Sequence, residues 1–414
     1  SEAHFVAGQY VEANIDNTRM VFFESLNPAD APETTLAQVV EEMVADGARL
    51  IFTTSDEFEE DTLAVAEANP DILFVNISGD DALTGEAPEN LSNLMGAMEW
   101  GKQIAGCAAA LATDTGKIGY LGPLINFETR RLASSVYLGA RYCYENYRGL
   151  NPDDLQFTVT WIGFWFNIPG LTLDPTEETQ RFFDQGADVV VSGIDTTEAI
   201  VVAGQRAAEG DTVWAIPYDF EGACAEAPEV CLGVPYFNWG PGYVKAIQAA
   251  MAGEWEQFWI WDAPYWDDLT DNDQTAVGWV NGDGLTDEQA AQLDEFIAFL
   301  AEADAGDITA ENIDDYQGSL GLWVGPLALQ DGTPLAEAGY VVPPRDVWYL
   351  EQLLEGMIGG RQTSVGDRRP PPGGRPFSGA GGGKRQRHVL YSPLWQVSRG
   401  VARPATPDAR ERCA

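Results

Sequence analysis

Histidine is scarce in this chain of 414 residues, where only His4 and His388 occur. Two histidines exclude a histidine metal cluster, and His4 is the single candidate outside the tail for a Ser-His-Asp arrangement. The GxSxG turn, a GxGxxG loop after a first strand and the Walker lysine loop are also absent. The sequence therefore favours a binding protein without a cofactor. The alternative is an enzyme that acts on a small polar substrate through carboxylates.

Lysine and arginine are scarce as well, with 23 of them against 65 Asp and Glu and a net charge of −42. Before residue 361 the counts are 12 basic against 62 acidic, and from Arg361 onward they are 11 against 3. The strongly acidic segment before residue 361 excludes binding to nucleic-acid phosphates, because such binding requires a cationic surface. We expect a solvated acidic surface. The alternative is an acidic patch dedicated to cations or to a basic partner.

Long apolar stretches are missing, since no run of eighteen apolar residues occurs, and no transmembrane segment is predicted. No signal peptide is visible. The chain opens in a helical pattern at 1–15, whereas an α/β chain normally opens with a strand. We therefore expect a first strand and any export signal to be missing from this chain, so the lack of a signal does not indicate a cytoplasmic location.

The five cysteines show no CxxC or Cys/His spacing typical of zinc, and no metal site is predicted. Cys224 and Cys231 flank a short acidic loop, which is equally compatible with two unpaired thiols and with a small-loop disulfide. Cys107 and Cys143 lie in Ala/Gly-rich and aromatic helical patterns and are predicted to be core residues.

The positive signal is an alternation of short β-branched runs with longer helical patterns, which predicts βαβ units and parallel sheets. Two such sets follow one another and predict an α/β fold of two lobes. Predicted strands lie near residues 20–24, 49–54, 72–78, 117–122, 155–162, 187–194, 212–217, 230–237 and 275–281, and predicted helices include 1–15, 33–46, 59–68, 93–112 and 127–147. Residues 361–414 are rich in Pro, Gly and Arg, which predicts a disordered tail without function. A basic nucleic-acid arm is the alternative.

Several β-type runs end in aromatic or acidic residues. In a parallel sheet the carboxyl ends of the strands meet a crevice, so these side chains predict a ligand cleft. Phe164 and Trp165 follow one strand. They are interpreted either as a stacking platform for an aromatic ligand or as a hydrophobic brace between lobe and loop. Asp195 follows another strand and is interpreted either as a ligand contact or as a helix N-cap. Tyr218 and Asp219 follow a third, and ligand contact is favoured for Asp219 because no helix begins directly after it.

The first half of the chain carries a counterpart in Ser55 and Asp56, where Asp56 is a ligand contact or a cap. Asn238 and Trp239 lie at a strand-to-helix turn, where free backbone N–H groups of the helix face a ligand. His4 lies on the first helix and is predicted to be a surface residue. Rings favour a flat or partly apolar ligand, and acids favour one that donates hydrogen bonds.

An ordered set of segments covering nearly all of 1–360 resembles the basic membrane protein family of substrate-binding proteins, the solute receptors of ABC importers related to purine nucleoside receptors. The segments are SEAH at the start, IFTTSDEF with TLAVAEANPDILFVNISG, KIGYLG, GARYCYENY, TWIGFWF, FFDQGADVVVSGIDTT, PYDFEG, VPYFNWGPGYVKAIQAAMAGEW and WVGPLALQDG with VWYLEQLLEGMIG.

The resemblance implies a periplasmic-binding-protein type I fold, with residues 1–121 and about 238–310 in the first lobe and residues 122–237 and about 311–360 in the second. It implies a nucleoside or nucleobase ligand, an ABC permease partner and a periplasmic or extracytoplasmic location, with a lipid anchor as an option. The chain departs from the family where Asn238 or Trp239 replaces a lysine found near the ligand in some nucleoside receptors. A ligand-sensing domain of a signalling protein is a third hypothesis.

Overall fold

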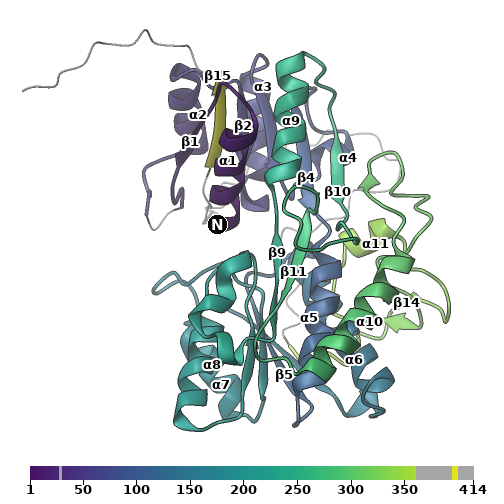
Figure 1. The fold of residues 1–414 in the computed structure, drawn as a ribbon. Coiled ribbons are helices and arrows are strands. Elements are labelled where there is room, and N and C mark those ends of the chain that lie inside the picture. The colour runs from purple at the N-terminus through teal and green to yellow at the C-terminus, as the bar shows by residue number, and fades with distance from the viewer. Residues whose placement is uncertain (28–29, 360–393, 400–414) are drawn as a thin grey trace, which may run out of the picture.

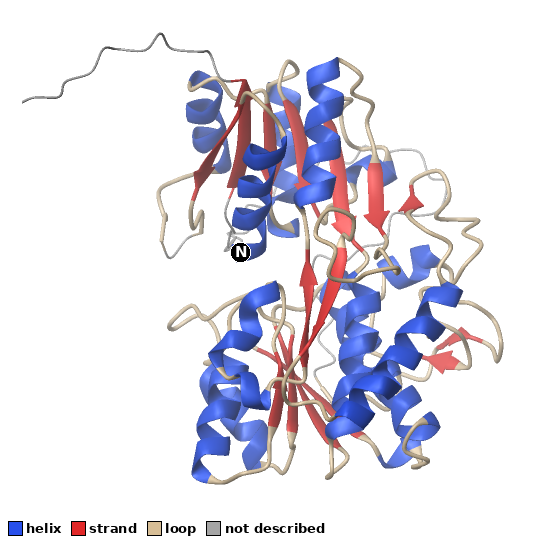
Figure 2. Cartoon of the chain, viewed as in Figure 1, coloured by secondary structure: helices blue, strands red, loops and turns tan. Residues whose placement is uncertain are grey.

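The computed structural model describes residues 1–27, 30–359 and 394–399 and contains two parallel-dominated sheets in separate lobes (Figure 1, Figure 2). The first sheet has the order β1-β15-β2-β3-β4-β10-β12 and the second the order β6-β5-β7-β8. The first comprises β1 (Thr18–Phe23), β2 (Leu50–Thr53), β3 (Leu73–Ile77), β4 (Leu91–Gly96), β10 (Trp259–Asp262), β12 (Ile308–Thr309) and β15 (Leu394–Arg399), and the second β5 (Lys117–Gly122), β6 (Gln156–Trp161), β7 (Val189–Ser192) and β8 (Trp214–Ile216). The α/β prediction is confirmed.

Helices cover both sheets. They are α1 (Glu2–Asn14), α2 (Leu36–Ala45), α3 (Glu59–Ala68), α4 (Asp81–Thr84), α5 (Met98–Ala112), α6 (Phe127–Asn146), α7 (Pro175–Asp184), α8 (Glu198–Glu209), α9 (Gly240–Ala252), α10 (Asp287–Ala303) and α11 (Pro344–Trp348). Helices α2 and α6 begin at capping boxes, in which the side chains of Thr35 and Asn126 accept hydrogen bonds from the backbone of Gln38 and Thr129. Within the described ranges, no helix has the length and apolar character needed to cross a membrane.

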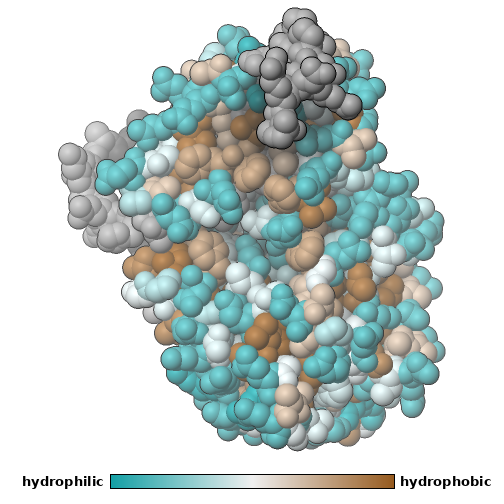
Figure 3. Space-filling model, turned by 60° about the vertical axis from the view of Figure 1, so that its left-hand side comes forward, coloured by the Kyte–Doolittle hydropathy of each residue, from teal (hydrophilic) through white to brown (hydrophobic). Residues whose placement is uncertain are grey.

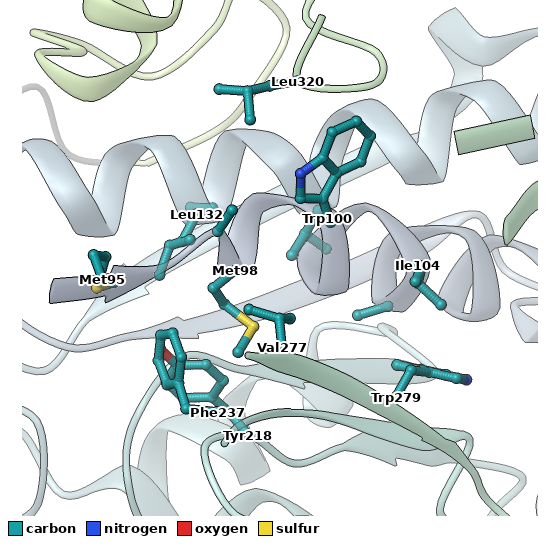
Figure 4. Packing of buried hydrophobic residues seen from close by; sticks show 14 of the residues in the cluster. Met95, Met98, Trp100, Ile104, Leu132, Tyr218, Phe237, Val277, Trp279 and Leu320 are labelled. Atoms are coloured by element: carbon teal, nitrogen blue, oxygen red, sulfur yellow. The ribbon is translucent and has the colours of Figure 1, made fainter. Parts of the chain in front are cut away.

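An antiparallel pair joins the two lobes. Strands β9 (Gly233–Phe237) and β11 (Val277–Asn281) run between the sheets (Figure 2). Their apolar side chains pack against α5, where Met98 points toward Val277 and Phe237, whereas Trp100 points toward Leu320 (Figure 4). A smaller hairpin, β13 (Leu327–Ala328) with β14 (Pro334–Ala336), lies toward the C-terminal end of the described body. The lobe boundaries given above stay a prediction.

Helices α5 and α6 pack closely because small residues face one another. A Cβ atom on Gly106 would lie 1.9 Å from the carbonyl oxygen of Val136, so only glycine fits there. The prediction that Cys107 and Cys143 are core residues is confirmed, since both are fully buried. They also form a disulfide between the two helices, which was not predicted. Spacing alone did not reveal this bond because the two cysteines are 36 residues apart.

The other cysteine pair settles an alternative that the sequence left open. Cys224 and Cys231 form the small-loop disulfide rather than two unpaired thiols. The loop that they close contains the 3-10 helix Pro228–Val230 and leads into β9.

Two predictions of local structure are wrong. The predicted helix 93–112 begins too early and includes part of β4, a strand at Leu91–Gly96 that lies directly before α5. Every residue of β4 is buried, so the alternation that reveals a half-exposed strand is absent. The tail was predicted to be disordered, yet Leu394–Arg399 forms β15 between β1 and β2, antiparallel to both. A composition averaged over the whole tail hides this short strand. The other residues of 361–414 lie outside the described residues.

The polar character of the surface is visible in a space-filling view. Hydrophilic residues dominate the face drawn in Figure 3, and apolar residues form separate patches between them.

Candidate functional site

Residues from both lobes line one interlobe pocket with a volume of about 50 Å³. They come from the carboxyl ends of strands in both sheets, from the start of α6, from the N-terminal segment and from the crossover after β9. The lining residues are Ser1, His4, Thr54, Ser55, Asp56, Ile77, Ser78, Met95, Glu128, Trp165, Asp195, Tyr218, Asp219, Phe237 and Trp239. Seven of the nine residues singled out in the sequence are among them.

Asp195 and Asp219 form the acidic part of the second-lobe wall. Burial raises the pKa of Asp219, while the nearby amino terminus lowers it. Burial also raises the pKa of Asp195, and the charge of Asp219 raises it further. The hydroxyl of Ser1 donates a hydrogen bond to Asp219 at 2.7 Å. Asp219 has a φ of 76°, in the left-handed region that residues other than glycine rarely adopt, and such positions concentrate at functional sites.

Four aromatic residues form the apolar part of the pocket. Phe237 and Trp239 stack with ring centroids 4.5 Å apart, and Tyr218 meets Phe237 edge-on at 5.9 Å. Trp165 approaches from the loop after β6, which is tied to the next loop because Asp195 N–H donates to the Trp165 carbonyl at 2.9 Å. The indole N–H groups of Trp165 and Trp239 are buried and have no hydrogen-bond partner within the described part of the chain. A ligand with acceptor atoms would satisfy them.

His4 was predicted to be a surface residue, and that prediction is wrong. Its side chain is 4% exposed, shares a 2.8 Å hydrogen bond with the Tyr243 hydroxyl and stacks on Trp239 at 4.9 Å. Burial lowers the pKa of His4, and the amino terminus lowers it further, so the ring is neutral near pH 7. The helix pattern placed His4 on α1 but did not reveal that this face packs on α9.

Ser55 and Asp56 lie at the end of β2. The Ser55 hydroxyl accepts a hydrogen bond from the Glu57 backbone and therefore provides the cap that was considered for Asp56. The Asp56 carboxylate instead accepts a hydrogen bond from the side-chain amide of Asn126. Burial raises the pKa of Asp56, and the charge of Glu128 raises it further.

The structure does not bring Phe164 and Asn238 to this pocket. Phe164 is buried in a small cluster with Ile168 and meets Phe166 edge-on at 4.9 Å, which matches the hydrophobic brace. The side-chain amide of Asn238 donates to the carbonyl oxygens of Asn272 at 2.9 Å and Thr275 at 2.7 Å. Asn238 therefore fixes the loop around the crossover.

Lys102 is a residue that the sequence reasoning missed. It is fully buried on α5, its ammonium lies 3.4 Å from the centroid of the Tyr218 ring, and it donates to the Ser192 carbonyl at 2.9 Å. Burial lowers the pKa of Lys102, whereas the charges of Asp219 and Asp195 raise it. The one available signal was a lysine inside an otherwise small and apolar helical segment.

Among the residues that the structure describes, no group of three His, Cys, Asp or Glu side chains is placed to hold a metal ion.

Comparison with known proteins shows a family match over most of the body. The model of the family described as Bmp, ABC transporter substrate-binding protein PnrA-like, matches residues 14–263. A purine-binding protein from Brucella abortus (strain 2308) is 26% identical over 334 residues, covering 80% of each chain. A candidate ABC transporter glucose-binding protein from Haloferax volcanii is 27% identical over 266 residues, covering 63% of this chain and 60% of that protein.

A solved structure with a similar fold is a transcriptional activator of the comK gene from Bacillus halodurans. It superposes with a TM-score of 0.52 at 18% identity, covering 72% of this chain and 92% of that one. The two-lobed architecture is the periplasmic-binding-protein type I fold implied by the sequence resemblance.

Proposed function

The chain belongs to the Bmp family of PnrA-like ABC transporter substrate-binding proteins, and from this premise we propose that it is the extracytoplasmic receptor of an ABC importer. Its proposed ligand is a purine nucleoside, a nucleobase or a similar heterocycle held between the lobes. The observation that carries the proposal is the convergence of aromatic rings and carboxylates from both lobes on one pocket. The similarity to a purine-binding protein supports the same ligand class.

The pocket has the chemical groups that a purine requires. A purine has two flat faces, ring nitrogens that accept hydrogen bonds and N–H groups that donate them. The Trp165 ring offers a stacking surface, whereas Trp239 already stacks on His4 and Phe237. The indole N–H groups of both residues have no partner among the described residues and serve as donors. Asp195 and Asp219 supply acceptors, and a buried carboxylate left unpaired disfavours analogues without a matching donor.

Ligand entry requires movement of the lobes. A volume of about 50 Å³ accommodates only a few water molecules. In addition, the Asp219 carboxylate already accepts a hydrogen bond from the Ser1 hydroxyl. We therefore propose that the lobes part about the crossover strands β9 and β11, and that contacts to both lobes select the closed form. The ligand then passes to a membrane permease unaltered, which distinguishes this role from the enzyme alternative. A periplasmic location and a lipid anchor are part of the same proposal.

Isothermal titration calorimetry tests the proposal. The protein is first unfolded and refolded to remove any small molecule carried over from purification. Adenosine and adenine should bind with heat that saturates at one site, and glucose should not. Mass spectrometry of the recovered ligand should show no change in mass. Binding of glucose without either purine would overturn the proposed ligand class, and a converted ligand would favour the enzyme.

A further inference from the structure

A second, larger chamber adjoins the interlobe pocket and shares Asp56, Ser78 and Glu128 with it. Its volume is about 410 Å³. Its lining is carboxylates and aromatic rings together with a few other side chains: Asp56, Glu59, Glu60, Leu63, Ser78, Asp80, Asp81, Thr84, Glu86, Asn126, Phe127, Glu128, Arg131, Trp348 and Tyr349. We propose that this chamber binds an organic cation, a molecule with an ammonium group that lies between the carboxylates and the rings.

The charge of the chamber is strongly one-sided. Seven of the lining side chains are carboxylic acids, and Arg131 is the one basic residue among them. That guanidinium is already engaged, because its Nε donates to Glu99 at 2.7 Å and its centre lies 4.1 Å from the Trp348 ring centroid. Arg131 and Glu99 are both buried and opposite in charge, and Arg131 is only the smallest of the causes that shift the pKa of Asp56, so most of the chamber's carboxylate charge has no counter-charge.

Asp81 provides an observation that does not depend on counting charges. The residue is 6% exposed, and its Oδ2 atom has no hydrogen-bond partner within the described ranges. The neighbouring Glu59, by contrast, accepts a hydrogen bond from the Asp80 backbone at 2.6 Å. A buried carboxylate oxygen without a donor is costly, and an N–H or O–H group of a bound ammonium compound supplies that donor.

The aromatic walls favour an organic cation over a neutral or an anionic ligand. Phe127 and Tyr349 meet edge-on with centroids 5.5 Å apart, and Trp348 lies beside them on α11. The Tyr349 hydroxyl donates to Asp80 at 2.5 Å, which fixes a ring next to a carboxylate. Rings combined with carboxylates are the groups that recognise ammonium ions, through cation–π attraction and ion pairing. An anion would be repelled, and a neutral polyol would leave the carboxylates without a counter-charge.

The organic cation proposed for the chamber is a different ligand from the heterocycle proposed for the interlobe pocket. Lobe closure links the two sites, because Ser78 donates to Glu128 across the shared wall. A cation in the chamber lies between first-lobe carboxylates such as Asp80 and second-lobe Glu128, so it reduces their repulsion and favours the closed form.

The test is calorimetric titration of the full chain at constant ionic strength with choline and with putrescine. Each has a neutral counterpart of similar shape, 3,3-dimethylbutan-1-ol for choline and butane-1,4-diol for putrescine. At least one cation should bind, and its neutral counterpart should bind at least about tenfold more weakly. Tighter binding of choline would indicate that the rings dominate, and tighter binding of putrescine that the carboxylates do. Equal binding of a cation and its neutral counterpart, or no binding of either cation, would overturn the proposal.

Variants locate the site. Asp81→Asn should weaken cation binding about tenfold, whereas the matched exposed control Asp16→Asn should leave it unchanged. If Asp81→Asn does not fold, Glu60→Gln at the exposed rim serves instead, with an expected loss of about threefold. Wild-type affinity in the folded chamber variant would contradict the assignment. Adenosine titrated into the same samples reports the interlobe pocket separately, so failure of one site is distinguishable from failure of the other.

Discussion

The side-chain amide of Asn126 donates a hydrogen bond to the carboxylate of Asp56 and thereby joins the two lobes across the wall between pocket and chamber. Asp56 follows β2 in the first lobe, and Asn126 is the N-cap of α6 in the second. The Ser78–Glu128 hydrogen bond lies beside it and also joins the lobes. We therefore expect side chains that line the pocket and the chamber to influence the proposed opening of the lobes.

Asn126→Asp should open the protein. An aspartate retains the capping oxygen that accepts from the Thr129 backbone, so α6 should remain stable. It also places a second carboxylate against Asp56, and repulsion replaces the hydrogen bond. Small-angle scattering without ligand should show a larger radius of gyration than in the wild type. Asn126→Ser, which keeps a cap without adding charge, should give a smaller increase, and an unchanged radius in both variants would contradict the role of this contact.

Asp219→Ala should weaken binding of the heterocycle by more than about 1.5 kcal/mol, since hydrogen bonds to charged groups contribute in that range. Calorimetry with adenosine measures the effect. Asp283→Ala, at an exposed position, is the control and should bind as the wild type does. A dissociation constant unchanged in Asp219→Ala would remove this residue from the site.

Trp239→Phe should reduce ligand affinity by about 1 kcal/mol while leaving the folded protein nearly as stable, because the indole N–H has no partner within the described residues to lose. Trp161→Phe is a matched control, since the Trp161 indole N–H is also buried without a partner in the described part of the chain, and Trp161 does not line the pocket. Both variants are compared by calorimetry and by urea unfolding. Equal affinities in the two variants would show that Trp239 makes no hydrogen bond to the ligand.

Stability should increase as the pH falls from 8 toward 5. Burial, together with the charges of Asp80 and Glu86, raises the pKa of Asp81 from an ordinary 3.8 to about 7. Between those values the folded state binds more protons than the unfolded state, so the free energy of unfolding decreases as the pH rises toward 7. The urea midpoint should follow this trend, and Asp81→Asn should flatten it, whereas Asp16→Asn should not. A midpoint that rises with pH in the wild type would contradict this expectation.

Strand ends were the most informative part of the sequence. Trp165, Asp195 and Asp219 each follow a strand of the second sheet, and the structure places all three at one pocket. Parallel strands align their carboxyl ends at one edge, so sequence position after a strand predicts spatial proximity. Phe164, one residue before Trp165, shares a buried cluster with Trp165 and Ile168 but does not line the pocket, because in this bent loop the position after a strand does not decide which way each ring points.

The sequence did not allow us to predict contacts between segments that lie far apart in the chain. Lys102 lies against the Tyr218 ring because α5 packs beneath the second sheet, and its helical pattern carries no information about that neighbour. The same holds for the Cys107–Cys143 disulfide, which depends on the close approach of α5 and α6. Strand β4 was missed because burial on both faces removes its alternation.

The sequence by itself determined the α/β class, the family and the carboxyl-end position of the ring and acid residues, because periodicity and strand order are local properties of the chain. Only the tertiary structure decided that His4 is buried, that Asp56 bonds to Asn126 and that Asp81 lines a second chamber with Trp348. Those relationships depend on how helices and lobes pack against each other, and packing is set by shape and burial across the whole molecule.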